Sequence, residues 1–328
     1  MVETMDVMES IRSFMKSRVI LSGAELDLFT LIDQGFETAE SLAKETGTDR
    51  RALTRLLDAI VTYGLLAKKS NRYHLTETGG FLSAAHPQTV LPMVMHMNQL
   101  WDKWSRLTDL VIKGGNPLET SPSQRDEKTM KAFIGAMHVV GRELSREIAA
   151  ELDLSPYTRL LDIGGASGTY TIAFLEKIPD LRAVLFDLPQ VLPIAEEKIA
   201  EAGMSERVDL FAGDFYHDPL PPGCDLALLS AIIHQNSPAQ NLELYKKIHR
   251  VLEPGGTLLI RDHIMEEDRV HPPAGAIFAI NMLSVTQGGD TYTFAEVRDC
   301  LAEAGFTDIR LIRQGERMDG IVTARKPV

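Results

Sequence analysis

The chain has 328 residues, 44% of them hydrophobic, and a formal net charge of −12 at pH 7. This length allows two hydrophobic cores, because single cores usually stop growing near ~250–300 residues. The negative charge repels phosphate backbones and anionic lipid headgroups, so nucleic acid and membrane surfaces are excluded as default partners.

The cysteines and the N-terminus narrow the class of protein further. Cys224 and Cys300 lack the spacing of a zinc site or a disulfide framework, so we expect no bound metal. The N-terminus, MVETMDVMES, is acidic where a signal peptide would be basic, and no apolar stretch approaches the ~20 residues of a membrane span. These features predict a cytoplasmic protein.

Residues 1–100 predict a small, mainly helical domain with the outline of a winged helix. Apolar residues recur at helical spacing, and a hairpin follows the helices. These amphipathic helices exceed what one small core can bury, which favours a homodimer formed through this domain. The expected elements are two helices within 8–32 that break near Ser22-Gly23, helices over 38–46 and 49–63, two short strands around Ser70-Asn71, and a turn at Gly79-Gly80.

The pattern changes after Pro156, where strands alternate with helices. This alternation is typical of a parallel sheet covered by helices on both faces. We therefore expect a Rossmann-like α/β domain over residues 151–328, joined to the N-terminal domain by a helical linker over 101–150. Seven strands are expected, in RLLDIG, AVLFDL, VDLFAG, DLALLSAII, TLLIRD, DIRLIRQ and GIVTARK, with helices that begin near Gly168, Pro189, Ser237 and Thr293.

A glycine-rich turn, DIGGASG, follows the first strand of this domain. Gly164 and Gly168 let the backbone approach a ligand closely, and the helix start offers free N–H groups. Asp187 ends the second strand, 19 residues past Gly168, where an acid can bind a ribose. A dinucleotide site would share these features, but Asp162 has no role beside a pyrophosphate and a clear one beside an aminoacyl sulfonium. The turn therefore favours S-adenosylmethionine.

The third strand ends in Ala212-Gly213-Asp214-Phe215. Asp214 offers an acceptor for an exocyclic amine and Phe215 offers an aromatic face, so adenine would fit there. Open α/β sheets bind ligands at the carboxyl ends of their strands, so the three strand ends together predict one cofactor site.

Nearly the whole chain resembles the S-adenosylmethionine-dependent O-methyltransferases of the caffeic acid and acetylserotonin type. The segments that carry this resemblance are LLDIGGASG (160–168), FDLPQV (186–191), AGDFY (212–216), LLSAIIH (228–234) and HRVLEPGGTLLI (249–260). The resemblance implies a class I methyltransferase fold, with an N-terminal lobe that dimerises and helps to close the partner's substrate pocket. It implies cofactor-binding roles for Asp162, Gly164, Gly165, Gly168, Asp187, Leu188, Gly213, Asp214, Phe215 and Ser230.

Candidate substrate-binding residues come from two arguments. Phe133, Met137 and Met282 match positions that line the substrate pocket in this family. Trp101 and Asn281 are added because they lie among aromatic and methionine side chains of the kind that suit a flat apolar substrate.

His234 is the candidate general base. It follows the apolar strand DLALLSAII, at the sheet edge where the methyl group should point. An imidazole there can take the proton of a phenol, whose pKa is near ~10, as the methyl group is transferred. The family's catalytic histidine occupies this position, which implies methyl transfer to a hydroxyl, of phenolic type, on a small molecule.

The surroundings of His234 depart from the family pattern. Gln235, Asn236 and Ser237 follow it where the family carries an aromatic or acidic residue and then further acids, and Thr291 replaces the glutamate that orients the histidine in plant members. Asp290 is either a substitute from one residue away or an exposed loop residue. Without a neighbouring charge, a sulfur or carbon acceptor that relies on proximity stays open as an alternative.

Two other functions fit parts of the sequence. A transcriptional regulator is suggested by the winged-helix outline, but the first 90 residues carry 10 basic and 12 acidic side chains, whereas DNA-binding modules are usually basic. A nicotinamide-dependent dehydrogenase would share the glycine turn.

Overall fold

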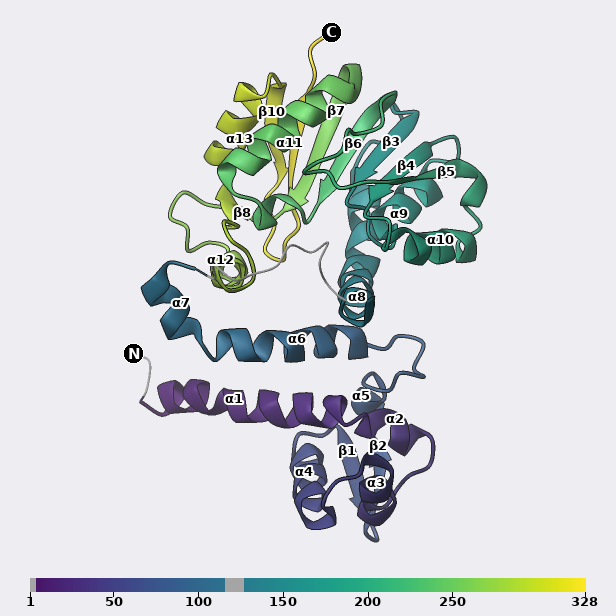
Figure 1. Ribbon diagram of the computed structural model, residues 1–328, viewed down its shortest axis with the longest axis vertical. Coiled ribbons are helices and arrows are strands. Elements are labelled where there is room, and N and C mark those ends of the chain that lie inside the picture. The colour runs from purple at the N-terminus through teal and green to yellow at the C-terminus, as the bar shows by residue number, and fades with distance from the viewer. Residues whose placement is uncertain (1–3, 116–126) are drawn as a thin grey trace. The chain divides into compact units, whose positions relative to one another are not determined.

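The computed structural model describes residues 4–115 and 127–328, which form two compact units (Figure 1). One unit extends to Trp101 and includes Gly135–Val139. The other contains the remainder of the described chain. No helix in the described ranges is long and apolar enough to cross a membrane.

The first unit contains five helices, a two-stranded hairpin and most of a sixth helix. Its core includes Leu28, Phe29, Leu57 and Ile60. The predicted helices at 38–46 and 49–63 and the hairpin are confirmed. The elements are α1 (Thr4–Glu25), α2 (Leu28–Asp33), α3 (Ala39–Thr46), α4 (Arg50–Thr62), β1 (Leu66–Lys69), β2 (Arg72–Leu75), α5 (Glu77–Gly80) and α6 (Leu91–Trp104).

The predicted break at Ser22-Gly23 is wrong. α1 continues through Gly23, and the chain turns at Asp27, which adopts a left-handed conformation with φ 54°. A Cβ on Gly23 would lie 2.8 Å from Cδ1 of Ile60, so this glycine serves close packing between helices. The turn expected at Gly79-Gly80 is instead the short helix α5.

The second unit is built on the seven-stranded sheet that the sequence predicts. The strand order is β10-β11-β7-β6-β3-β4-β5; the five strands from β7 to β5 are parallel, and β11 is antiparallel to both β7 and β10. The strands are β3 (Arg159–Ile163), β4 (Arg182–Asp187), β5 (Val208–Ala212), β6 (Cys224–Ser230), β7 (Leu252–Asp262), β10 (Thr307–Arg313) and β11 (Gly320–Arg325).

Helices cover both faces of this sheet and form two separate cores. One core includes residues of α8, α9 and α10, and the other includes residues of α11 and α13. The helices of this unit are α7 (Leu107–Lys113), α8 (Glu127–Glu151), α9 (Thr169–Lys177), α10 (Leu192–Glu201), α11 (Pro238–Val251), α12 (Pro273–Val285) and α13 (Phe294–Glu303).

Successive side chains of a strand point to opposite faces of the sheet, which determines the face on which the polar residue at each strand end lies. Leu160, Leu185, Leu228 and Leu259 all belong to the α9-side core. Side chains two residues further along a strand point to the same face. The carboxyl ends of β3, β4, β6 and β7 therefore place one polar side chain each on the α9 side, namely Asp162, Asp187, Ser230 and Arg261.

Two helix predictions in this unit need correction. α12 was not expected, because its sequence, PAGAIFAINMLSV, is almost uniformly apolar and carries no charged residue to mark an exposed face. α10 begins at Leu192 instead of near Pro189. The predicted starts at Gly168, Ser237 and Thr293 are confirmed, since each residue is the N-cap of its helix.

Candidate active site

The glycine-rich turn after β3 is held in an unusual backbone conformation. Gly164 and Gly168 have φ values of +70° and +73°, which favour glycine. A Cβ on Gly165 would lie 2.7 Å from Leu185 Cγ and 2.9 Å from Asp162 Oδ2. These glycines are thus required by the packing of the turn itself, as well as by any close approach of a ligand.

Asp162 lies buried beneath this turn with an unused acceptor. Its side chain is 1% exposed, and Oδ2 accepts a 2.6 Å hydrogen bond from Thr171 Oγ1. Oδ1 has no hydrogen-bond partner in the described chain. Burial raises the pKa of Asp162 to about 6, against the lowering effect of the Thr171 hydrogen bond. A buried acceptor of this kind is stabilised by a donor or cation that a ligand supplies.

Asp187, at the end of β4, is tied to the same turn. Oδ2 accepts a 2.8 Å hydrogen bond from the backbone N–H of Ala166, and Oδ1 accepts one of 2.7 Å from Leu188. Burial raises the pKa of Asp187 to about 6 even though these two hydrogen bonds lower it. The first two predicted strand ends therefore meet at one place.

The end of β5 joins them. The backbone N–H of Gly213 donates to the carbonyl of Asp187 at 2.9 Å. The ring of Phe215 packs close to Gly164, where an added Cβ would be 3.7 Å from Phe215 Cε1. Asp214 Oδ1 accepts a 2.9 Å hydrogen bond from the N–H of Tyr216, which fixes the carboxylate at this turn. The structure thus brings the three predicted strand ends together.

His234 lies just beyond the end of β6. The strand ends at Ser230 instead of continuing to Ile233, because Ala231 adopts φ 58°. His234 Nδ1 lies 2.9 and 3.0 Å from the two oxygens of Asp262, the last residue of β7. The His234 side chain is 12% exposed and that of Asp262 is fully buried, at 0%. Phe278 of α12 meets the imidazole edge to face, with ring centroids 4.9 Å apart.

Asp262 corrects the expectation that His234 lacks a neighbouring charge. Burial opposes ionisation of Asp262, but the charge and hydrogen bond of His234 and the charge of Arg261 outweigh it, so the pKa of Asp262 lies below its usual value. The imidazole therefore sits beside a carboxylate held in its ionised form.

Asp290 does not orient the imidazole. Its carboxylate accepts a 2.8 Å hydrogen bond from the N–H of Thr291 and lies 3.6 Å from Arg269. Only its backbone N–H reaches His234, donating to the carbonyl at 2.9 Å. The side chain of Asp290 is 49% exposed, as expected for a loop residue.

Buried polar groups hold the loop that carries His234. Asn236 is fully buried; its Oδ1 accepts a hydrogen bond from Tyr216, and its carbonyl accepts one from Tyr292. Asn236 Nδ2 donates to Asn241 Oδ1 at 2.9 Å, and Asn241 donates to the carbonyl of Ile233 at 3.0 Å. This departure from the family pattern is thus an anchor that fixes the position of the histidine.

The predicted substrate residues fall in both units. Met282 is buried in α12, and Asn281 accepts a 3.1 Å hydrogen bond from Trp104 Nε1. Met137 and Trp101 belong to the first unit, where the Arg18 guanidinium lies 5.4 Å from the Trp101 ring centroid. The side chain of Phe133 lies outside the described residues.

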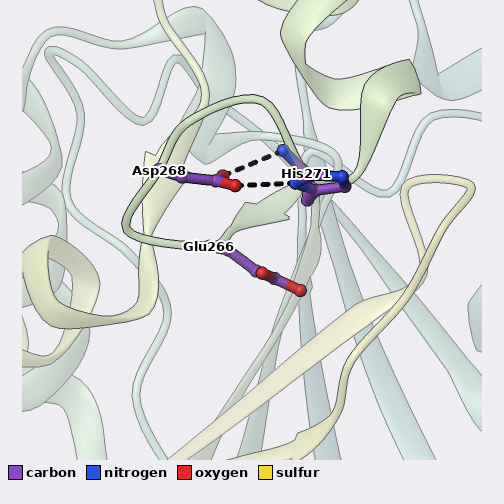
Figure 2. Close-up of side chains that lie close together, drawn as sticks. All are labelled: Glu266, Asp268 and His271. Carbon is purple, nitrogen blue, oxygen red and sulfur yellow. Dashed lines mark hydrogen bonds and ion pairs between the residues drawn. The ribbon is translucent and has the colours of Figure 1, made fainter.

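A separate group of potential metal ligands occupies the exposed loop between β8 (Ile264–Met265) and α12. Glu266, Asp268 and His271 bring ligand atoms within 4.8 Å of one another. Figure 2 shows that Asp268 faces His271, whereas Glu266 points away from both. His271 Nδ1 lies 2.7 Å from Asp268 Oδ2, and this hydrogen bond raises the pKa of His271. The Asp268–His271 pair is thus explained by its own hydrogen bonds.

Two family models match the sequence. The O-methyltransferase domain matches residues 104–307, and the O-methyltransferase dimerisation domain matches residues 8–84. The chain belongs to the O-methyltransferase family. The resemblance seen in the sequence segments is therefore confirmed, and this O-methyltransferase is an enzyme.

Relatives of this O-methyltransferase align along nearly its full length. The tetracenomycin polyketide synthesis 8-O-methyl transferase of Streptomyces glaucescens is 30% identical, over 98% of this chain and 96% of the relative. The 3-hydroxy-5-methyl-1-naphthoate 3-O-methyltransferase of Streptomyces sahachiroi is 32% identical, over 91% and 88%.

The solved structures identify the cofactor. Human N-acetylserotonin methyltransferase, crystallised with S-adenosylmethionine, shares 26% identity, with a TM-score of 0.85 over 98% of this chain and 97% of that chain. S-adenosylmethionine is therefore the cofactor of this O-methyltransferase, as the acid before the glycine turn predicted. The rival dehydrogenase interpretation of the same turn is wrong.

Sequence reasoning missed two residues that touch His234 in this O-methyltransferase. Asp262 is the last residue of the predicted strand TLLIRD, so the strand-end rule that selected Asp162 and Asp187 could have found it. Phe278 gave no such signal, because it lies in α12, whose apolar sequence shows no helical pattern.

Proposed function

We propose that this enzyme transfers a methyl group from S-adenosylmethionine to a phenolic hydroxyl of a small aromatic molecule, with His234 as the general base. The observation that carries the proposal is the 2.9 Å contact between His234 Nδ1 and the buried carboxylate of Asp262. The names of both Streptomyces relatives describe O-methyl transfer, in one of them to a hydroxynaphthoate.

The residues at the strand ends suit this cofactor. The unpartnered Oδ1 of Asp162 would face its cationic aminoacyl sulfonium portion, and Asp187 its ribose. Asp214 and Phe215 would hold the adenine. Gly164, Gly165, Gly168, Leu188, Gly213 and Ser230 would shape the surrounding surface. When bound, S-adenosylmethionine supplies a methyl group activated for displacement by its positive sulfur.

The Asp262 contact determines which nitrogen of His234 acts. Nδ1–H donates to the carboxylate, so the lone pair of Nε2 remains for the substrate. Nε2 would take the proton of the acceptor hydroxyl, and the oxygen would accept the methyl group that the cofactor supplies, with S-adenosylhomocysteine as the leaving group. The imidazolium that results is stabilised by Asp262. This carboxylate removes the reason for favouring a sulfur or carbon acceptor.

A screen of methyl acceptors tests the proposed function. Phenols, quinols, thiols, hydroxy acids and carbon nucleophiles would be offered with methyl-labelled S-adenosylmethionine, and the products identified by mass spectrometry. We expect label on phenolic oxygen. Label confined to thiols or carbon acceptors would contradict the proposal while leaving the cofactor assignment intact.

Cofactor affinity is expected to depend on the charge of Asp162. Asp162→Asn should weaken S-adenosylmethionine binding by about 10- to 100-fold, the range for loss of a hydrogen bond to a charged group. Asp187→Asn should weaken it as well, because an amide cannot accept both backbone N–H bonds. Isothermal titration calorimetry would measure both, with Asp209→Asn on the exposed part of β5 as the matched control. Unchanged affinity in both variants would remove these two assignments.

The pKa values near 6 predict a pH dependence for the same binding. Both carboxyls are protonated at pH 5 and ionised at pH 7.5, so affinity for the cationic cofactor should rise between these values. In the ligand-free protein, the free energy of unfolding should change with pH in the opposite direction. The folded pKa values exceed the unfolded value of about 3.9, so unfolding free energy should increase as the pH falls from 7 to 4. Titrations at the two pH values would show no difference if these carboxyls stayed ionised throughout.

A homodimer is proposed to form through the dimerisation domain. α1 exposes an apolar stripe whose members are Val7, Met8, Ile11, Phe14 and Met15. These residues recur one helical turn apart on one face, and the matched dimerisation domain begins at residue 8. An exposed apolar patch of this kind marks a protein–protein contact.

Charges on that stripe should separate the dimer. The double variant Ile11→Asp and Phe14→Asp should sediment as a monomer at micromolar concentration, because each carboxylate would be buried without a partner. Ser13→Asp, on the opposite side of α1, adds the same charge off the stripe and should remain dimeric. A wild-type monomer, or a dimer that survives both stripe substitutions, would refute this interface.

A further inference from the structure

Arg261 is a buried cation next to the candidate cofactor site. It precedes the last residue of β7 and is 5% exposed. Its register partner on β6 is Ser230, so the two side chains lie side by side on the α9 face of the sheet. Arginine is rarely buried this deeply without a charged partner.

The hydrogen-bond and ring partners of Arg261 are neutral, although its charge also acts on Asp262, the next residue of β7. Nε donates to Ser230 Oγ at 2.9 Å, and Nη1 donates to the carbonyl of Met318 at 2.7 Å. The guanidinium lies 4.9 Å from the ring centroid of Tyr170. In the described part of the chain, Nη2 forms no hydrogen bond and no carboxylate oxygen comes within 4.0 Å of the guanidinium. A desolvated cation of this kind is stabilised by an anion.

The position of Arg261 continues a row of polar strand ends. In strand order, Asp187 ends β4, Asp162 is the last residue but one of β3, Ser230 ends β6 and Arg261 is the last residue but one of β7, all on the same face. Strands lie about 4.8 Å apart, and β7 is two strands away from β3. Asp162 is in register with Leu259, two residues or about 7 Å before Arg261, so the backbones of Asp162 and Arg261 start about 12 Å apart. Charge along this row changes from negative to positive.

Tyr170 links the two charges. It occupies the first turn of α9, directly after the glycine-rich turn. Burial raises the pKa of its hydroxyl, the Arg261 charge lowers it, and the Asp162 charge raises it. The Tyr170 hydroxyl is buried without a hydrogen-bond partner among the described residues, and both the guanidinium and the Asp162 carboxylate act on it at the start of α9.

We infer that Arg261 binds the carboxylate of the methionine portion of S-adenosylmethionine. The inference rests on the cofactor assignment and on the proposed placement of its cationic portion at Asp162. The aminoacyl tail then runs along the strand ends from β3 towards β7, with its anionic end at the guanidinium. The free Nη2 donors supply the charge-assisted hydrogen bonds that a carboxylate accepts. Arg261 thereby selects against adenosyl ligands that lack this carboxylate.

The test compares two ligands on three proteins. S-adenosylhomocysteine and decarboxylated S-adenosylhomocysteine differ only in the carboxylate. Calorimetric titration of wild type, Arg261→Met and Arg261→Lys with both ligands measures how much affinity the ligand carboxylate contributes with and without the guanidinium. Arg207→Met is the matched control. Arg207 directly precedes the edge strand β5, and its guanidinium donates only to backbone carbonyls.

Wild type should bind S-adenosylhomocysteine about 10- to 100-fold more tightly than the decarboxylated ligand. Arg261→Met should lose that preference, Arg261→Lys should keep part of it, and Arg207→Met should keep all of it. Equal affinity of wild type for the two ligands would overturn the role of Arg261 alone, even if Arg261→Met failed to fold. An unchanged preference in Arg261→Met would also overturn it. Failure of wild type to bind either ligand would overturn both the cofactor assignment and the role of Arg261.

Discussion

Replacing His234 with alanine is expected to lower kcat on a phenolic acceptor by about 10²- to 10⁴-fold, the range for loss of general base catalysis. The imidazole is the group proposed to take the hydroxyl proton, and its orientation is fixed by Asp262 on one side and by Phe278 edge to face on another. Affinity for S-adenosylhomocysteine should stay nearly unchanged, because His234 lies beyond the strand ends proposed to bind the cofactor. Single-turnover rates and calorimetry would measure the two effects separately.

His271→Ala is the matched control for this experiment. It removes another histidine that is paired with an aspartate, but the pair with Asp268 lies on an exposed loop. Turnover of this control should stay close to wild type. If His234→Ala also stayed within a few-fold of wild type on the best phenolic acceptor, His234 would not be the base.

The acidity of the acceptor provides a second check on the base. A phenol that is already ionised at the assay pH has no proton for His234 to remove, so its rate should fall much less in His234→Ala. The fold decrease in rate caused by His234→Ala should therefore become larger as the pKa of the acceptor rises. A loss that is the same for all acceptors would indicate that His234 positions the substrate and does not take its proton.

The strand ends proposed to bind the cofactor could be located from the sequence because they depend on short stretches of it. Asp162 and Asp187 lie at the carboxyl ends of apolar strands and Asp214 follows the next one, and parallel strands bring their carboxyl ends to one edge. The buried strands of the sheet could be found for the same reason, since they are marked by continuous apolar runs.

The pairing of His234 with Asp262 was harder to predict because it depends on the neighbouring strand of the sheet. Asp262 is 28 residues from His234, and the two meet only because β6 and β7 are adjacent and parallel. No charged residue lies within a few positions of His234 in the sequence, and the more distant Asp290 does not reach the imidazole with its side chain. Arg261 shows the same effect, since nothing in TLLIRD reveals that its guanidinium is buried.

Replacing Asp262 with asparagine is expected to lower kcat by about 10²- to 10³-fold, although Asp262 does not touch the substrate in the proposed mechanism. Asparagine keeps the size of the side chain but removes the charge that stabilises the imidazolium. Its amide group can also present an N–H to Nδ1, which would place the imidazole proton on Nε2 and block proton uptake. Asp262→Glu, which keeps the charge, should recover part of the rate. The dependence of kcat on pH should change shape in Asp262→Asn, which a purely structural role would not produce.

The pH dependence of the melting temperature provides a control that does not depend on turnover. The folded pKa of Asp262 lies below its unfolded value of about 3.9, so the ionised carboxylate contributes stability above that pH and loses it as the pH falls further. The Tm of wild type should therefore decline more steeply below pH 4 than the Tm of Asp262→Asn. Wild-type turnover in a folded Asp262→Asn protein would contradict the positioning role. His234 would then have to act without a carboxylate partner, because no other carboxylate among the described residues contacts the imidazole.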